Sequence, residues 1–181
     1  FDGTDDSISI PQISLTNSYT IFARVNRTST SYDFIFGHTT NNTKIGYDNI
    51  ANSLFLRVVN GGSSITYGVT SSTWDTIVLT RDSSDKIDLY FNGGSAVRLF
   101  SDVAQSGALY IDILGVDGGG NYLASKANEA RIYTRTLSAT EVYELYQSRY
   151  SNDTGLVLNL NPSSYNATSG VWEDLSGQNN D

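Results

Sequence analysis

The chain contains no cysteine, so neither a disulfide framework nor a thiolate metal site can form. It contains a single histidine, His38, which argues against histidine-rich zinc sites and against nucleophiles of the Cys–His type. No apolar run reaches the length of a membrane-spanning helix. These absences remove several classes of metalloprotein, thiol enzyme and integral membrane protein.

Basic residues are also scarce, with 11 Lys and Arg against 19 Asp and Glu and a net charge of −8. Because phosphate groups and anionic lipids are bound by clustered basic residues, we expect neither nucleic acid nor membrane insertion. Methionine is absent even at position 1, which predicts a processed product or an excerpt of a longer protein. The 181 residues fit one domain of the larger all-β kind.

Short β-branched and aromatic runs, separated by Gly, Asn, Asp and Ser clusters, fill the sequence. In one of them Ile87, Leu89 and Phe91 alternate with polar neighbours, as in a strand with one solvated face. About a dozen such runs indicate an all-β fold of two antiparallel sheets packed face to face. The predicted strands are 7–10, 19–25, 34–37, 44–47, 53–59, 64–69, 76–81, 86–91, 96–100, 108–115, 127–133 and 156–160.

Two turns and one helix can be predicted between these strands. Asn92-Gly93 and Asn60-Gly61-Gly62 favour the positive φ angles of tight hairpins. Ser138 and Glu141 have the spacing of a capping box, which predicts that a short helix begins there. Val142 would lie on the face of that helix that packs on the sheet.

Five runs occur in a characteristic order: Phe1-Asp2-Gly3, 20–25, 74–81, Leu89-Tyr90-Phe91-Asn92-Gly93 and 129–146. Together they resemble a laminin-G-like module of the concanavalin A-like lectin–glucanase superfamily, as found in bacterial and phage surface proteins. The resemblance covers most of residues 1–147. It implies a two-sheet antiparallel jelly-roll β-sandwich whose concave sheet or rim loops often bind glycans, frequently with calcium.

The last part of the chain resembles the lead-in that normally precedes such a module. We therefore divide the chain into a sandwich over residues 1–150 and a tail over 151–181. Leu156, Leu158 and Leu160 alternate, which predicts one strand in the tail. Two interpretations remain open: the chain is cut from tandem modules, or its tail closes this same sandwich in a permuted frame.

Catalysis is not expected. Glycoside hydrolases that share this fold place several carboxylates alternately on one strand, so that two of them reach one cleft. The best-placed run, 110–115, has a single carboxylate, Asp112, and no glutamate. Trp74 is expected in the core, as the family pattern implies.

Calcium is the candidate cofactor, because hard cations need several oxygen ligands. Asp2, Asp5 and Asp6 provide carboxylates within one short stretch, and Asp117 provides another on a glycine-rich loop. The alternative, which we favour, is that the first three residues form a polar turn before a strand, since no loop contains a full calcium-binding consensus.

A saccharide site would need exposed aromatic rings beside amide and carboxylate groups, because pyranose faces stack on rings. Trp172 in the tail is a further candidate ring. The candidate ligand-binding residues are Tyr32, Tyr47, Tyr67, Tyr122 and Asn121.

The sequence thus predicts a non-catalytic laminin-G-like module of a larger surface protein that binds a glycan or a protein in adhesion. The alternative is a structural decoration or fibre module of a phage-like virion, and a glycoside hydrolase is a distant third. The expected partners are a glycan or protein on a cell or particle surface, with copies of the chain itself or capsid and fibre proteins as further candidates. The expected location is extracellular or on a virion surface.

Overall fold

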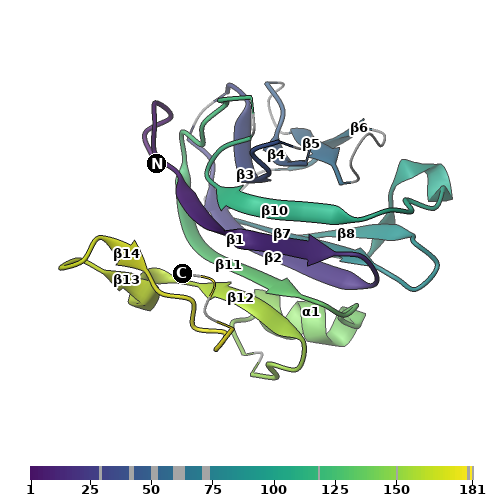
Figure 1. Cartoon of the computed structure of the whole chain (residues 1–181). Coiled ribbons are helices and arrows are strands. Elements are labelled where there is room, and N and C mark those ends of the chain that lie inside the picture. Colours follow the sequence, from purple (N-terminus) through teal and green to yellow (C-terminus); the bar gives the residue numbers. More distant parts are fainter. Residues whose placement is uncertain are drawn as a thin grey trace. The chain divides into compact units, whose positions relative to one another are not determined.

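The computed structural model describes residues 1–28, 30–40, 43–49, 53–58, 64–70, 74–117, 119–149, 151–178 and 180. These residues form two six-stranded antiparallel sheets, a separate two-stranded hairpin and one α-helix (Figure 1). The predicted all-β jelly-roll class is therefore confirmed. No helix among the described residues has the length and apolar character needed to cross a bilayer.

The chain divides into two compact units, and each contains one of the large sheets. Sheet A has the strand order β1 (Ile8–Leu15), β10 (Leu109–Leu114), β3 (Asp33–Gly37), β4 (Lys44–Tyr47), β5 (Ser53–Arg57) and β6 (Ser64–Gly68). Sheet B has the order β12 (Leu156–Leu160), β11 (Lys126–Tyr133), β2 (Tyr19–Asn26), β7 (Asp75–Arg81), β8 (Ile87–Phe91) and β9 (Val97–Arg98). The remaining elements are η1 (Phe100–Asp102), α1 (Ala139–Tyr146), η2 (Pro162–Ser164), β13 (Tyr165–Asn166) and β14 (Val171–Trp172).

The bounds of β1 and β9 differ from the predicted strands 7–10 and 96–100 for identifiable reasons. β1 continues through Pro11, because its pairing with β10 shifts register between Ser9 and Ile13 and Pro11 falls in that irregular stretch. β9 is shorter than predicted, because the backbone turns at Phe100 with positive φ angles in η1. The predicted Asn60-Gly61-Gly62 hairpin lies outside the described residues.

Helix α1 packs on one face of sheet B. Ser138 and Glu141 form the predicted capping box, which satisfies two backbone N–H groups at the start of the helix. Val142 and Leu145 are buried against strand residues, and burial of each stabilises the fold by about 2 kcal/mol. Together with residues of sheet B and its loops they form one buried hydrophobic cluster, which comprises Phe22, Val78, Tyr90, Tyr133, Leu137, Val142, Leu145 and Leu156.

The tail contributes the edge strand of sheet B. β12 pairs antiparallel with β11, with Leu158 opposite Ile132 and Leu160 opposite Ala130. Leu156, Leu158 and Leu160 are all buried, as their alternation predicts. The strand predicted in the tail therefore belongs to the same sheet as the strands before it.

Trp74 requires a correction. It was expected in the core, but its side chain is 39% exposed and it lies just before β7 begins. Burial begins with the next residue, Asp75, and continues through all of β7.

Candidate functional site

One face of sheet A carries a cluster of aromatic rings, of which Tyr32 is exposed and Phe34 is buried. On β5 the side chains of Leu54 and Leu56 are fully buried, whereas Phe55 between them points to the opposite face and is half-buried. Phe34 and Gly46 stand opposite each other, as do Gly46 and Phe55, so this face continues over three strands. We call it the outer face of sheet A and define it by Tyr32, Phe34, Lys44, Gly46 and Phe55.

Three rings pack together on the outer face. Tyr32 stacks on Phe34, with ring centroids 5.8 Å apart and an interplanar angle of 12°. Phe55 meets Phe34 edge-on at 5.7 Å and Tyr32 at 6.1 Å. Gly46 lets the backbone of β3 approach closely, because a Cβ there would lie 2.3 Å from the Asp33 carbonyl oxygen. Tyr32 remains 38% exposed, so a supported ring faces solvent.

Polar groups adjoin this ring cluster. The Lys44 ammonium lies 5.5 Å from the Phe34 ring centroid and 2.5 Å from a carboxylate oxygen of Asp117. Asp117 also accepts hydrogen bonds from the backbone and side-chain amides of Asn121, at 2.9 and 2.8 Å. A chain of contacts therefore leads from Tyr32 to Asn121, two of the predicted ligand-binding residues.

The environment of Asp117 keeps its carboxylate charged. Burial alone would raise the pKa of this group, but the hydrogen bonds from Lys44, Asn121 and Gly119 outweigh burial and hold the pKa below its ordinary value. Its side chain is fully buried. Asp117 is predicted as a metal ligand, yet its carboxylate is already neutralised by Lys44.

The lone histidine and the lone β10 carboxylate lie together elsewhere on sheet A. Asp112 accepts hydrogen bonds from the Thr39 backbone N–H at 2.9 Å and the Thr39 hydroxyl at 2.6 Å. His38 is buried, and its Nδ1 accepts from the Thr40 backbone N–H at 3.0 Å. Its Nε2 therefore carries the proton and donates to Gln12 Oε1, 3.0 Å away. The hydrogen bonds of Asp112 thus hold the segment that directly follows β3.

The other tyrosines predicted to bind a ligand do not lie on the outer face of sheet A. The prediction for Tyr47 is corrected: this residue is fully buried with the Arg27 guanidinium 4.8 Å above its ring, so it offers no stacking surface. Tyr67 pairs with buried Leu54 and thus lies on the face opposite Phe55. Tyr122 is half-buried and bridges to Val116, next to Asn121.

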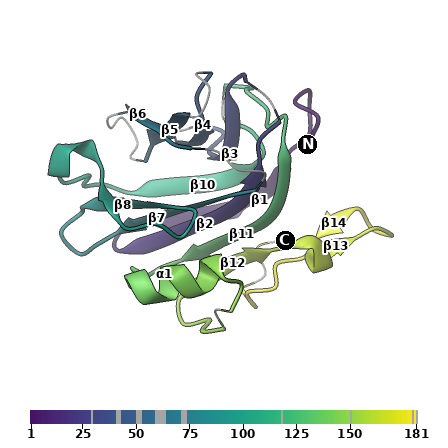
Figure 2. The same ribbon diagram turned by 180° about the vertical axis from the view of Figure 1, so that it is seen from behind.

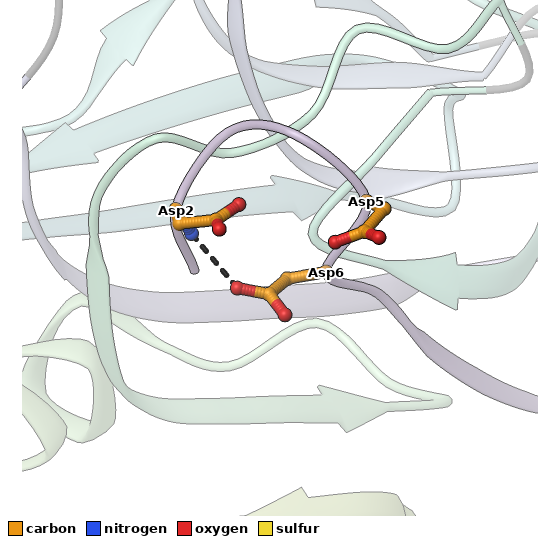
Figure 3. A group of neighbouring side chains, drawn as sticks. All are labelled: Asp2, Asp5 and Asp6. Carbon is orange, nitrogen blue, oxygen red and sulfur yellow. Dashed lines mark hydrogen bonds between the residues drawn. The ribbon is translucent and has the colours of Figure 1, made fainter.

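The three predicted N-terminal metal ligands do come together. Carboxylate oxygens of Asp2, Asp5 and Asp6 lie within 4.8 Å of one another, and all three residues are exposed (Figure 3). Two of them also hold the turn: Asp6 accepts from the Asp2 backbone N–H at 2.8 Å, and Asp2 accepts from the Thr4 N–H at 2.8 Å. Asp117 is not part of this group.

A family model described as the concanavalin A-like lectin/glucanases superfamily matches residues 2–143, which is most of the chain. The chain belongs to this superfamily. The resemblance seen in the sequence motifs is thereby confirmed. No curated protein matches the chain.

Solved structures show the same superfamily fold at low sequence identity. A proposed carbohydrate-binding protein from Bacteroides ovatus has a TM-score of 0.72 at 17% identity, over 98% of this chain and 55% of that one. A heptameric SAP-like pentraxin from Limulus polyphemus has a TM-score of 0.55 at 14% identity, over 81% and 79%. Domain 4 of the extracellular arabinanase AbnA from Geobacillus stearothermophilus, in complex with arabinotriose, has a TM-score of 0.52 at 20% identity, over 77% and 68%. The chain thus spans about half the length of the Bacteroides protein.

In this superfamily member, the outer face of sheet A includes two aromatic residues and one cation that were not predicted from the sequence: Phe34, Phe55 and Lys44. A signal for Phe55 was present, since strict alternation around it places Leu54 and Leu56 in the core and turns Phe55 outward. The same alternation could not show which face of the sheet Phe34 occupies. The register of β3 shifts between Phe34 and Phe36, which breaks the period of two.

Proposed function

We propose that this chain is a non-catalytic glycan-binding module and that the outer face of sheet A contacts the saccharide. The observation that carries the proposal is the exposed Tyr32 ring, stacked on Phe34 and flanked by Phe55. A ring held by neighbours loses little conformational freedom when a ligand binds, which favours affinity.

The chemistry of the outer face suits a sugar. The C–H groups on one side of a pyranose or furanose ring are apolar and cover an aromatic face, whereas its hydroxyls need hydrogen-bond partners. Lys44 and Asn121 supply a cation and an amide close to the ring cluster, and the buried Asp117 carboxylate between them holds both in place. The similar structures described as a proposed carbohydrate-binding protein and as an arabinotriose complex support this ligand class.

The carboxylates support binding rather than hydrolysis. A glycoside hydrolase needs an accessible general acid with a raised pKa and a second carboxylate in the same cleft. In sheet A the carboxyl with a raised pKa is Asp33, where burial is the main cause. Its residue is fully buried and accepts hydrogen bonds from the Ser125 hydroxyl and the Ala124 N–H, so no substrate reaches it.

The proposal is tested by screening the protein on an array of neutral and acidic glycans, with and without calcium. We expect saturable binding to at least one glycan class and no release of reducing sugar from that ligand on prolonged incubation. Binding to no glycan would overturn the proposal and favour the structural role of a virion module. Turnover of the bound glycan would overturn its non-catalytic part.

A further inference from the structure

A second aromatic pair lies outside sheet A and outside the segment matched by the family model. Tyr165 of β13 and Trp172 of β14 stand directly opposite each other, with ring centroids 5.2 Å apart. Tyr165 is 46% exposed and Trp172 is half-buried. Figures 1 and 2 both show this hairpin as a ribbon that extends beyond the end of β12. We call Tyr165 and Trp172 the hairpin pair.

The hairpin that carries the pair is held in place from both ends. Before β13, the Asn161 side chain caps η2, accepting from the Ser163 N–H at 2.9 Å. After β14, Asp174 accepts from the Asn159 N–H at 2.9 Å and from the Ser176 N–H at 2.9 Å. Because Asn159 belongs to β12, these bonds tie the hairpin to sheet B. The two rings are therefore positioned before any ligand arrives.

The tip of the hairpin is fixed by local bonds as well. The Asn166 side-chain oxygen accepts from the Thr168 N–H at 3.0 Å, and the Asn166 amide donates to Glu173 at 3.2 Å. Asn166 and Glu173 are exposed and follow Tyr165 and Trp172 along their strands. Because successive side chains of a strand point to opposite faces, this bonded pair lies on the face of the hairpin opposite the two rings.

Charge and size limit what the pair can bind. After Arg149 the sequence has no Lys, Arg or His, but it contains Asp153, Glu173, Asp174 and Asp181. Anionic glycans and nucleic acid therefore find no counter-charge in this segment. Two rings also offer far less surface than the roughly 800 Å² per partner of a stable protein interface. They match the size of one or two sugar units.

We infer that the hairpin pair is a second saccharide contact, specific for neutral oligosaccharides and independent of the outer face of sheet A. Trp172 supplies the stacking surface, and Tyr165 supports it from the neighbouring strand. The Asn166–Glu173 hydrogen bond on the opposite face of the hairpin holds the two strands that carry the rings.

The chain contains only two tryptophans, Trp74 and Trp172, which allows a direct test. In a Trp74→Phe variant all tryptophan emission comes from Trp172. This protein is titrated with neutral arabinan, xylan, cellulose and starch oligosaccharides of about three to six units, and with sialyllactose as an anionic comparison. We expect a saturable change of emission with at least one neutral oligosaccharide and none with sialyllactose at the same concentration.

Three further variants in the Trp74→Phe background separate this inference from the proposed function. Tyr165→Ala should weaken the Trp172 response by about fivefold, in line with the energy of an aromatic contact. Tyr32→Ala should leave the response unchanged. Tyr143→Ala, which removes another exposed tyrosine, is the matched control and should also leave it unchanged.

The inference is overturned if no neutral oligosaccharide changes the Trp172 emission at millimolar concentration. A second outcome would contradict the inference and still support the proposed function. In that outcome the protein binds a glycan, the binding is lost in Tyr32→Ala, and the Trp172 emission does not change. Emission that varies with protein concentration instead of sugar would identify the hairpin as a contact between copies of the chain, which also contradicts the inference.

Discussion

The Asn92 side chain accepts a hydrogen bond from the backbone N–H of Thr76 at 2.7 Å, and so joins two separate sequence motifs. Its amide also donates to Asp75 at 3.1 Å, and Asp75 is fully buried. Asn92 has a φ of 50°, which asparagine tolerates better than most residues. The tip of the β8 hairpin and the start of β7 are thereby held together.

This contact predicts that Asn92→Gly lowers the free energy of unfolding by about 2 kcal/mol, because buried backbone and side-chain groups lose their partners. Asn92→Ala should cost about 1 kcal/mol more, since alanine is strained at positive φ. Urea unfolding of the two variants measures both effects. Equal stability of Asn92→Gly and the parent protein would show that the contact contributes nothing.

Gly93 should tolerate no side chain. It has a φ of 71°, and a Cβ at this position would lie 2.5 Å from the ring of Tyr146 in α1. Gly93→Ala is therefore expected to lower the free energy of unfolding by about 3 kcal/mol. Gly94→Ala is the control, because its φ is not positive and its nearest atom would be 3.1 Å away. A loss as large in Gly94→Ala as in Gly93→Ala would refute this explanation.

Two buried aspartates of sheet A should affect stability with opposite pH dependence. Burial raises the pKa of Asp33 above its ordinary 3.8, so the folded state holds this proton more tightly than the unfolded state. The pKa of Asp117 is lowered by Lys44 and the loop amides despite burial, so folding favours its charged form. Asp33 therefore contributes more stability as the pH falls through its raised pKa, whereas Asp117 contributes less as the pH falls below about 3.8.

Asp33→Asn and Asp117→Asn separate these contributions when unfolding is measured from pH 7 to pH 3. The stability difference between parent and Asp117→Asn should be about 3 kcal/mol at pH 7, because Lys44 loses its buried partner, and should shrink in acid. The difference between parent and Asp33→Asn should instead move in favour of the parent as the pH falls. The same slope for both variants would contradict the assigned pKa directions.

The cluster of Asp2, Asp5 and Asp6 should respond weakly to calcium. All three residues are exposed, and two of them already accept backbone hydrogen bonds within the turn. A site with a Kd of about 1 mM adds only about 0.4 kcal/mol at 1 mM Ca²⁺. Thermal unfolding with calcium or with a chelator measures this gain. A gain several times larger that disappears in Asp5→Asn would establish a true calcium site.

Much of the fold could be predicted because local patterns and tertiary structure agree here. Alternation at Leu156, Leu158 and Leu160 predicted β12 with its observed bounds, and Ser138 with Glu141 predicted the start of α1. The two-residue strands β13 and β14 could not be predicted, since two residues show no period. Their pairing depends on the capped turn at Asn161 and on Asp174.

The candidate site could be predicted only in part. Tyr32 and Asn121 were identified by residue type near loops, and the structure connects them through Phe34, Lys44 and Asp117. Residue type alone did not distinguish the buried Tyr47 from the exposed Tyr32. Tyr47 is buried because β4 pairs between β3 and β5, and this pairing cannot be read from the residue type. Which face of a central strand is covered is a property of the sheet and not of the strand alone.

The most direct test of the central claim is the affinity for the strongest array glycan, measured by calorimetry for the parent, Tyr32→Ala and Tyr143→Ala. Tyr143 is a similarly exposed tyrosine on α1, so its replacement controls for loss of surface aromatic area. We predict that Tyr32→Ala weakens binding by about tenfold, or about 1.4 kcal/mol, while Tyr143→Ala stays within about twofold of the parent. Unchanged affinity in Tyr32→Ala, with the variant still folded, would contradict the placement of the saccharide on the outer face of sheet A.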